Sequence, residues 1–165
     1  MGLALSYGML VRPLVLILAL LSAAPALADV ARLAGTWLCS ETRYRGGVET
    51  MTRLEARVTE TGRVAAAVEI TFRQGAEAGL AQFGMIADWR LEGDALFETP
   101  VEVTTLYAEF GGEDRTRSAP VEDMRLDLAT PVETPSEVVF YGTDLFLIVP
   151  PGPAPRVMPC HRVPL

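Results

Sequence analysis

Residues 63–73, RVAAAVEITFR, decide the fold class, because apolar and polar side chains alternate along this stretch. One face carries Val64, Ala66, Val68, Ile70 and Phe72, and the other carries Arg63, Glu69, Thr71 and Arg73. Successive side chains of a β-strand point to opposite faces of its sheet. The alternation therefore predicts a strand with one buried face and one solvated face.

Similar segments lie on both sides of this strand, separated by turn signals such as Gly46-Gly47 and Glu92-Gly93-Asp94. We expect strands over residues 35–44, 48–58, 63–73, 81–91, 138–141, 145–149 and 157–163, with one or two more over 95–110, interrupted near Pro100. Residues 74–79 and 111–118 are expected to be loops. Short connections between successive strands predict a mainly β fold, an antiparallel up-and-down meander that forms a small barrel or a curved sheet.

One short helix is expected over residues 120–128, before the last hairpin. Pro120 suits a first helical turn, and Val121, Met124 and Leu128 share one apolar stripe. The strands of the last hairpin are apolar on both faces, so both faces of the hairpin must be covered. We expect this helix to cover one face.

The first 28 residues have the layout of a cleavable secretory signal peptide. Arg12 precedes an apolar run over residues 14–21, and small residues follow, ending in Ala26-x-Ala28. A retained membrane anchor is the alternative, but this run is much shorter than the roughly 20 residues that span a bilayer. Cleavage would leave one domain, residues 29–165, in the periplasm or outside the cell, with no membrane anchor.

The charge of the chain disfavours two classes of partner. The whole chain has 14 basic and 21 acidic residues, a formal net charge of −7, and every basic residue is arginine. Nucleic acids and anionic membrane surfaces both select positive patches. We therefore expect no nucleic-acid partner.

Cys39 and Cys160 are the two cysteines, and they lie near the two ends of the predicted domain. In an oxidising compartment the simplest expectation is a disulfide, which would close a loop across 160 − 39 = 121 positions. A loop of that length corresponds to about 4–5 kcal/mol at most. Two free thiols or an intermolecular bridge are the alternatives.

The residues that could carry out catalysis are few. His161 is the one histidine, and no nucleophile motif such as G-x-S-x-G accompanies it. Structural zinc needs four ligands, and the chain holds three Cys and His residues in all. We expect no metal, no cofactor and no enzymatic activity.

Trp37, Phe83 and Trp89 are the candidate ligand-binding residues. By strand parity Trp37 shares a face with Cys39, and Trp89 shares one with Phe83 and Met85, so all point inward. Large aromatic side chains on such faces usually pack the core. The other possibility is that they line a cavity that admits an apolar ligand, as small barrels can.

Gly35-Thr36-Trp37 near the start, with Arg162 beside Cys160 near the end, resembles the G-x-W signature and late arginine of lipocalins and other calycins. The GTW-x-C start and C-x-R end are also similar to small lipocalin-like proteins exported by Gram-negative bacteria. The resemblance implies a barrel with Trp37 packed beneath Arg162.

Many members of that family bind a small hydrophobic molecule. The first hypothesis is therefore an exported, non-enzymatic, lipocalin-like protein that holds a small apolar ligand or serves as a structural module. The alternative is a periplasmic interaction module. It would bind an envelope protein, or inhibit a hydrolase, through an acidic surface.

Overall fold

The computed structural model describes residues 30–132, 134–152 and 156–164, so the predicted signal peptide, residues 1–28, lies outside the described residues. The strands are β1 (Gly35–Arg45), β2 (Val48–Val58), β3 (Arg63–Gln74), β4 (Glu77–Glu92), β5 (Ala95–Phe110), β6 (Glu113–Asp114), β7 (Ser136–Phe140), β8 (Leu145–Val149) and β9 (Met158–Arg162). The helix α3 (Ala119–Ala129) precedes the β7–β8 hairpin. This confirms the mainly β, antiparallel meander. No helix in the described ranges is long and apolar enough to cross a membrane.

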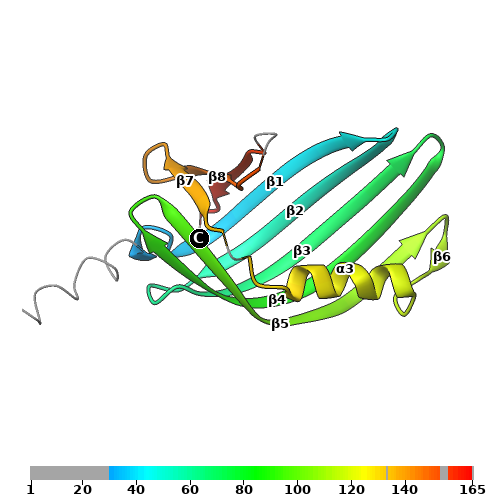
Figure 1. The fold of residues 1–165 in the computed structure, drawn as a ribbon, viewed down its shortest axis with the longest axis horizontal. Helices are drawn as coiled ribbons and strands as arrows, with labels where there is room; N and C mark the ends of the chain where they lie inside the picture. Colours follow the sequence, from blue (N-terminus) through cyan, green and yellow to red (C-terminus); the bar gives the residue numbers. More distant parts are fainter. Residues whose placement is uncertain (1–29, 133, 153–155, 165) are drawn as a thin grey trace, which may run out of the picture.

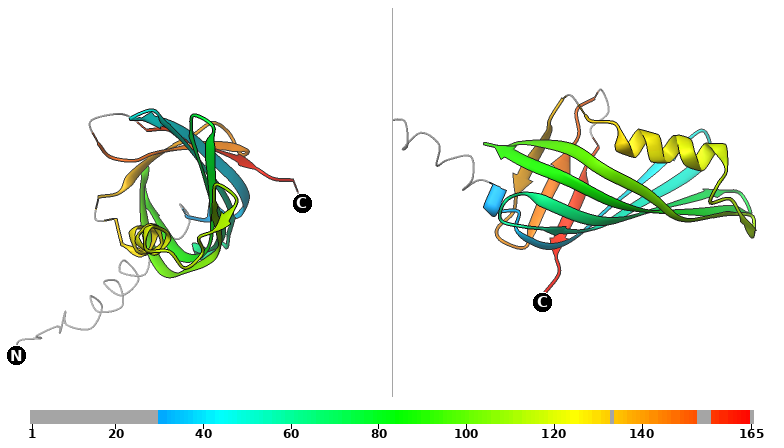
Figure 2. Two further views of the ribbon diagram at one scale, coloured as in Figure 1. Left: turned by 90° about the vertical axis from the view of Figure 1, so that its right-hand side faces the viewer. Right: turned by 90° about the horizontal axis from the view of Figure 1, so that it is seen from below.

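The sheet closes on itself as a ring (Figures 1 and 2). Its strand order is β4-β3-β2-β1-β9-β8-β7-β5, and β4 also pairs with β5, while β6 pairs with β5 alone. Strands β1–β5 are 11 to 16 residues long, whereas β7, β8 and β9 have five residues each. The three short strands therefore complete the ring over only part of its length. The result is a ring-like sheet and not a regular barrel.

We call the part that β7–β9 do not reach the open half. On one side of the ring β9 pairs with β1 only at Trp37, Leu38 and Cys39. On the other side β7 pairs with β5 only at Ala95 and Leu96. Beyond these ladders β1 and β5 lie on opposite sides of an opening.

The prediction of a loop over residues 74–79 was wrong. Strands β3 and β4 continue into it, with Gln74 opposite Glu77, so that Gly75 and Ala76 alone form the turn. Gly75 has φ +61°, which suits glycine at a tight hairpin turn. The predicted loop over residues 111–118 likewise contains β6, a short strand that pairs with Glu109 and Phe110.

Strand β5 runs past Pro100 without a break because two bulges absorb the irregularity. Val101 and Leu106 are the extra residues, each left without a partner on β4, and they are 53% and 58% exposed. A bulge adds a residue without ending a strand. Val103 and Ala108 consequently keep facing the core, where both are buried.

Helix α3 forms where the apolar stripe predicted it, but it packs along β5 and not over the last hairpin. Val121 is fully buried, and Met124 and Leu128 pack against the core. These side chains meet the long strand β5 because, between its short ladders with β7 and β6, that strand has no neighbouring strand on the side away from β4. The prediction that α3 covers the β7–β8 hairpin was therefore wrong.

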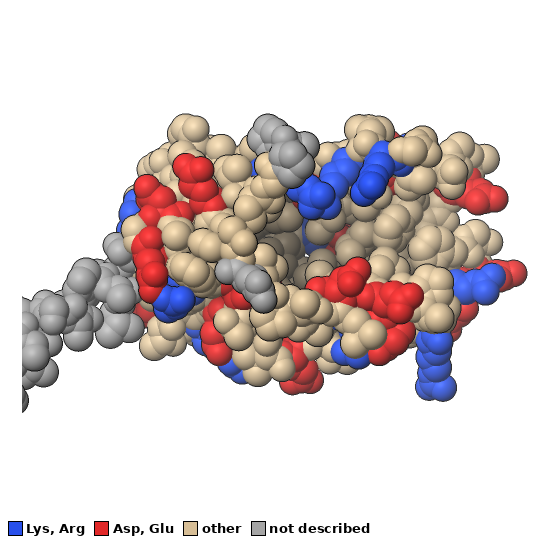
Figure 3. Space-filling view, in the orientation of Figure 1, with Lys and Arg blue, Asp and Glu red and all other residues tan. Residues whose placement is uncertain are grey.

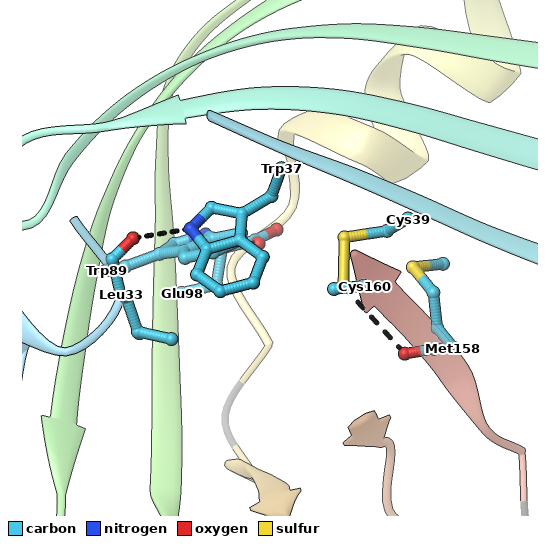
Figure 4. The surroundings of a disulfide bond; sticks show 7 residues. All are labelled: Leu33, Trp37, Cys39, Trp89, Glu98, Met158 and Cys160. Atoms are coloured by element: carbon cyan, nitrogen blue, oxygen red, sulfur yellow. Dashed lines mark hydrogen bonds between the residues drawn. A yellow bond between two sulfur atoms is a disulfide. The ribbon is translucent and has the colours of Figure 1, made fainter. Parts of the chain in front are cut away.

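The predicted disulfide is confirmed (Figure 4). Cys39 and Cys160 lie directly opposite each other on the neighbouring strands β1 and β9, with their Cα atoms 4.0 Å apart. Both are fully buried. The bond joins the first and last strands at the point where the closed part of the ring gives way to the open half.

Candidate functional site

The open half exposes part of the concave face of the sheet, and strand register places its residues in two rows. The first row is Glu41, Thr52, Ile70, Ala81 and Ala108, from β1 across to β5. The second row, nearer the hairpin ends, is Arg43, Thr50, Phe72, Gly79 and Phe110. Each row is polar on β1 and β2 and apolar on the side of β5. The concave face thus has one polar wall and one apolar wall.

A cavity of about 600 Å³ lies against the apolar wall, and we call it the hairpin-end cavity. Its lining residues are Val48, Phe72, Gln74, Glu77, Ala78, Gly79, Phe110, Gly111, Glu113, Arg115, Pro120 and Met124. Pockets of roughly 300–1,000 Å³ accommodate small molecules. Figure 3 shows the molecule hollowed in this region, above the acidic side chains of α3.

An aromatic pair forms the apolar part of the cavity wall. The rings of Phe72 and Phe110 are stacked, with centroids 5.6 Å apart and planes inclined by 28°. Gly79 lies between them in the row, and a side chain there would collide with the Phe110 ring. The glycine therefore allows the rings of β3 and β5 to meet across β4.

Helix α3 forms the remaining wall through Pro120 and Met124. Its position against β5 is held by Arg125, which donates from Nη1 to the Val103 carbonyl oxygen at 3.3 Å. The same guanidinium donates to both carboxylate oxygens of Glu122 at 2.9 and 2.6 Å, which lowers the pKa of that carboxyl. The helix thus rests on β5 through an apolar stripe and a hydrogen-bonded flank.

Glu41 is the one buried charged residue among the described residues, with 8% of its surface exposed. Its carboxylate pairs with Arg43, two positions along the same face of β1. Glu41 was not among the candidate residues predicted from the sequence, although strand parity with Trp37 and Cys39 was a signal that could have found it. A buried ion pair adds little net stability, so its position on the polar wall is a feature that packing alone does not explain.

The three residues predicted to bind ligand lie in the core. Trp37, Phe83 and Trp89 have at most 2% of their surface exposed, and none of them lines the hairpin-end cavity. Trp37 Nε1 donates to the Leu33 carbonyl oxygen at 2.7 Å (Figure 4). The Trp37 ring packs edge-on against Phe146. Ligand binding by these three residues stays a prediction.

Glu98 is a half-buried acid on β5 that was not among the candidate residues predicted from the sequence. It accepts a hydrogen bond from Trp89 Nε1 at 2.7 Å. Burial raises the pKa of the Glu98 carboxyl, and the bond from the indole opposes that rise only in part. Glu98 also lines a second cavity of about 90 Å³ with Ser136 and Thr134, beside the short β5–β7 ladder. Its parity with the apolar Leu96 was the signal that could have found it.

Within the described ranges no three His, Cys, Asp or Glu side chains come together to form a metal site. His161 is exposed on β9, next to the disulfide. What this geometry offers is an apolar cavity with polar groups at one side, which can hold a molecule and exclude water from part of it.

Arg162 lies over the Trp37 ring, with Cζ 4.2 Å from the ring centroid, as the resemblance implied. No protein-family model matches the chain, and no curated protein is significantly similar to it. The class that the structure itself defines is an all-antiparallel, ring-like β protein compatible with a calycin-like fold.

Proposed function

We propose that the protein is an exported, non-enzymatic, lipocalin-like protein that binds a small, mainly apolar ligand in the hairpin-end cavity. The observation that carries the proposal is the cavity itself, which is about 600 Å³ in volume and is walled by the stacked Phe72 and Phe110 rings and by Met124. The internal disulfide supports an oxidising compartment, either the periplasm or the exterior of the cell.

Binding of the neutral apolar dye N-phenyl-1-naphthylamine to the oxidised protein tests this proposal. The dye fluoresces when it leaves water, so saturable enhancement is expected. Met124→Trp would fill the cavity and weaken binding about tenfold, which corresponds to about 1.4 kcal/mol. Leu126→Trp is the matched control, because Leu126 lies on the same helix but is 48% exposed and lines none of the cavity.

Two results would contradict the proposal. One is an absence of saturable binding by the folded wild-type protein. The other is equal affinity for the dye in the wild-type and Met124→Trp proteins, with native circular dichroism in both, since the dye would then sit elsewhere.

The second candidate function is an envelope-protein partner or hydrolase inhibitor that acts through an acidic surface. The observation that favours it is the row of exposed acids on α3, Glu122, Asp123 and Asp127. Figure 3 shows acidic side chains over this helix, along one side of the hollow.

A further inference from the structure

Strand β1 has a free edge in the open half. Beyond Cys39 no described strand pairs with it on the side away from β2. The Thr36 carbonyl oxygen accepts from the Val163 N–H at 2.8 Å, so the backbone groups of Thr36 point to the β9 side. Because these directions alternate along a strand, the N–H and C=O groups of Thr42 and Tyr44 point to the same side. The last β1–β9 pair is Cys39–Cys160, so no described strand lies opposite Thr42 and Tyr44 on that side.

The edge of β5 on the other side of the opening differs from the edge of β1, because its backbone groups have hydrogen-bond partners. The Ala108 N–H donates to Thr116 Oγ1 at 3.0 Å, and the Ala108 carbonyl oxygen accepts from the Arg115 N–H at 2.8 Å. Arg125 caps the Val103 carbonyl oxygen farther along. One edge of the opening is therefore capped by the chain's own groups, and the other edge is not.

The width of the opening follows approximately from the number of strands that α3 replaces. In the closed part three strands fill the space between β5 and β1, which is about 14 Å at roughly 4.8 Å per strand. In the open half α3 takes the place of those strands, and a helix with its side chains is about 10 Å across. About one strand width then remains, next to the free edge of β1.

The helix presents negative charge to this space. Arg125 and Glu122 occupy the flank of α3 that meets the edge of β5. At 100° per residue, Asp123 and Asp127 fall with Pro120 on the opposite flank, and Pro120 lines the hairpin-end cavity. Both aspartates are exposed, and neither has an ion-pair partner among the described residues.

We propose that the free edge of β1 binds an extended, basic segment of a partner protein by strand addition. The segment would hydrogen-bond to Thr42 and its neighbours and place a lysine or arginine beside Asp123 and Asp127. On β1 itself Arg43 is paired with Glu41, whereas the exposed Arg45 has no ion-pair partner among the described residues, so the basic residue of the segment is expected on the α3 side and not on the β1 side. Backbone pairing supplies the affinity in this mode of recognition, and side chains supply the selectivity. The inference does not depend on the ligand proposed for the cavity.

Three synthetic peptides test the proposal by calorimetry with the oxidised full-length protein. The first is Lys-Val-Thr-Val-Lys-Val-Thr, the second has glutamate in place of lysine, and the third is the basic peptide N-methylated at alternate residues. The basic peptide is expected to bind about tenfold more tightly than the other two. N-methylation removes the donors of one peptide edge, and two lost backbone bonds at about 1 kcal/mol each account for such a change.

Variants of the protein locate the binding. Thr42→Pro removes an N–H that the fold does not use, so it should lower the affinity for the basic peptide about tenfold. Thr42→Val keeps this N–H and should bind the basic peptide with wild-type affinity. Asp123→Asn with Asp127→Asn should reduce the preference for the basic over the acidic peptide. Glu122→Gln, on the other flank, should leave that preference unchanged.

Several outcomes would overturn the proposal. These are no binding of any peptide, equal affinity for the plain and N-methylated peptides, or full binding by a natively folded Thr42→Pro protein. If Thr42→Pro fails to fold, the comparison of the plain and N-methylated basic peptides on the wild-type protein still tests strand addition. A wild-type dimer that Thr42→Pro abolishes would assign the edge to a second copy. None of these results bears on dye binding in the cavity, so the dye experiment tests the proposed function independently of the peptide experiment.

Discussion

Arg162 closes the ring over Trp37. Its guanidinium carbon lies 4.2 Å from the indole centroid, and Nη1 donates to the Ala34 carbonyl oxygen at 2.7 Å. Nε donates to the Thr143 carbonyl oxygen at 2.9 Å. One side chain on the last strand thus contacts the entry to β1, the ring of its tryptophan and the β7–β8 turn. Gly35 makes room for it, since a side chain at that position would collide with Arg162 Nη1.

Arg162→Ala is therefore expected to lower the free energy of unfolding by about 2–3 kcal/mol, from the cation–π contact and two hydrogen bonds. Urea denaturation of the oxidised protein measures this change. Arg57→Ala is the control, because Arg57 is an exposed arginine on the outer face of β2, and its effect should stay within about 0.5 kcal/mol. Equal effects of the two substitutions would show that Arg162 does not join the strands.

The Cys39–Cys160 bond is expected to hold β7–β9 against the rest of the sheet. Only three residue pairs link β9 to β1 and two link β7 to β5. Reduction should lower the free energy of unfolding by about 2–5 kcal/mol. Hydrogen exchange should show β7–β9 losing protection first, because strands with few hydrogen-bonded neighbours open locally.

Alkylation of the denatured protein before reduction provides the control, and it should find no free thiol. Uniform loss of protection across all strands after reduction would contradict the idea that β7–β9 separate as a unit.

The strands could be predicted wherever side chains alternate strictly. Residues 63–73 and 81–91 are such segments, and each lies within a strand of the structure. Small residues misled the prediction at 74–79, where Gly75 serves a two-residue turn and the neighbouring polar residues pair across the hairpin. Strand parity is compatible with inward positions for Glu41 and Glu98, but neither acid was predicted to face inward, because a buried acid is not expected without knowledge of its partners.

The open half could not be predicted from the sequence. It arises because five-residue strands follow strands of 11 to 16 residues around one ring. It also depends on where α3 packs. The helix stripe of Val121, Met124 and Leu128 identifies a buried face but does not say which strand it meets. Nothing in the sequence therefore distinguishes the cavity residues Phe72 and Phe110 from ordinary core residues.

The half-buried Glu98 carboxyl should make stability depend on pH. Its pKa is raised in the folded protein, chiefly by burial, so the folded state binds more protons than the unfolded state between the two pKa values. The stability that the protonated Glu98 carboxyl contributes is fully present at low pH. It is lost as the pH rises through the pKa of this carboxyl in the folded protein. Glu98→Gln should thus be more stable than the wild type at about pH 8, and its stability should vary less with pH.

Urea denaturation between about pH 4.5 and 8 measures this difference. Glu102→Gln is the control, because Glu102 is an exposed acid on the same strand. A wild-type protein that becomes relatively more stable than Glu98→Gln as pH rises would contradict the prediction.

Gly79 and Gly84, two glycines of β4, should respond in opposite ways to alanine. At Gly79 a Cβ would collide with the Phe110 ring, so Gly79→Ala must separate the stacked pair. The expected cost is about 1–3 kcal/mol, typical of overpacking, together with weaker dye binding in the hairpin-end cavity. At Gly84 the nearest atom to a Cβ is Leu106 Cδ2 at 3.8 Å, an ordinary contact. Gly84→Ala should be neutral or stabilise by up to about 1 kcal/mol, because alanine has fewer unfolded conformations than glycine. Thermal denaturation of both variants checks the contrast, and equal melting temperatures would show that the Phe72–Phe110 pair accommodates a methyl group without cost.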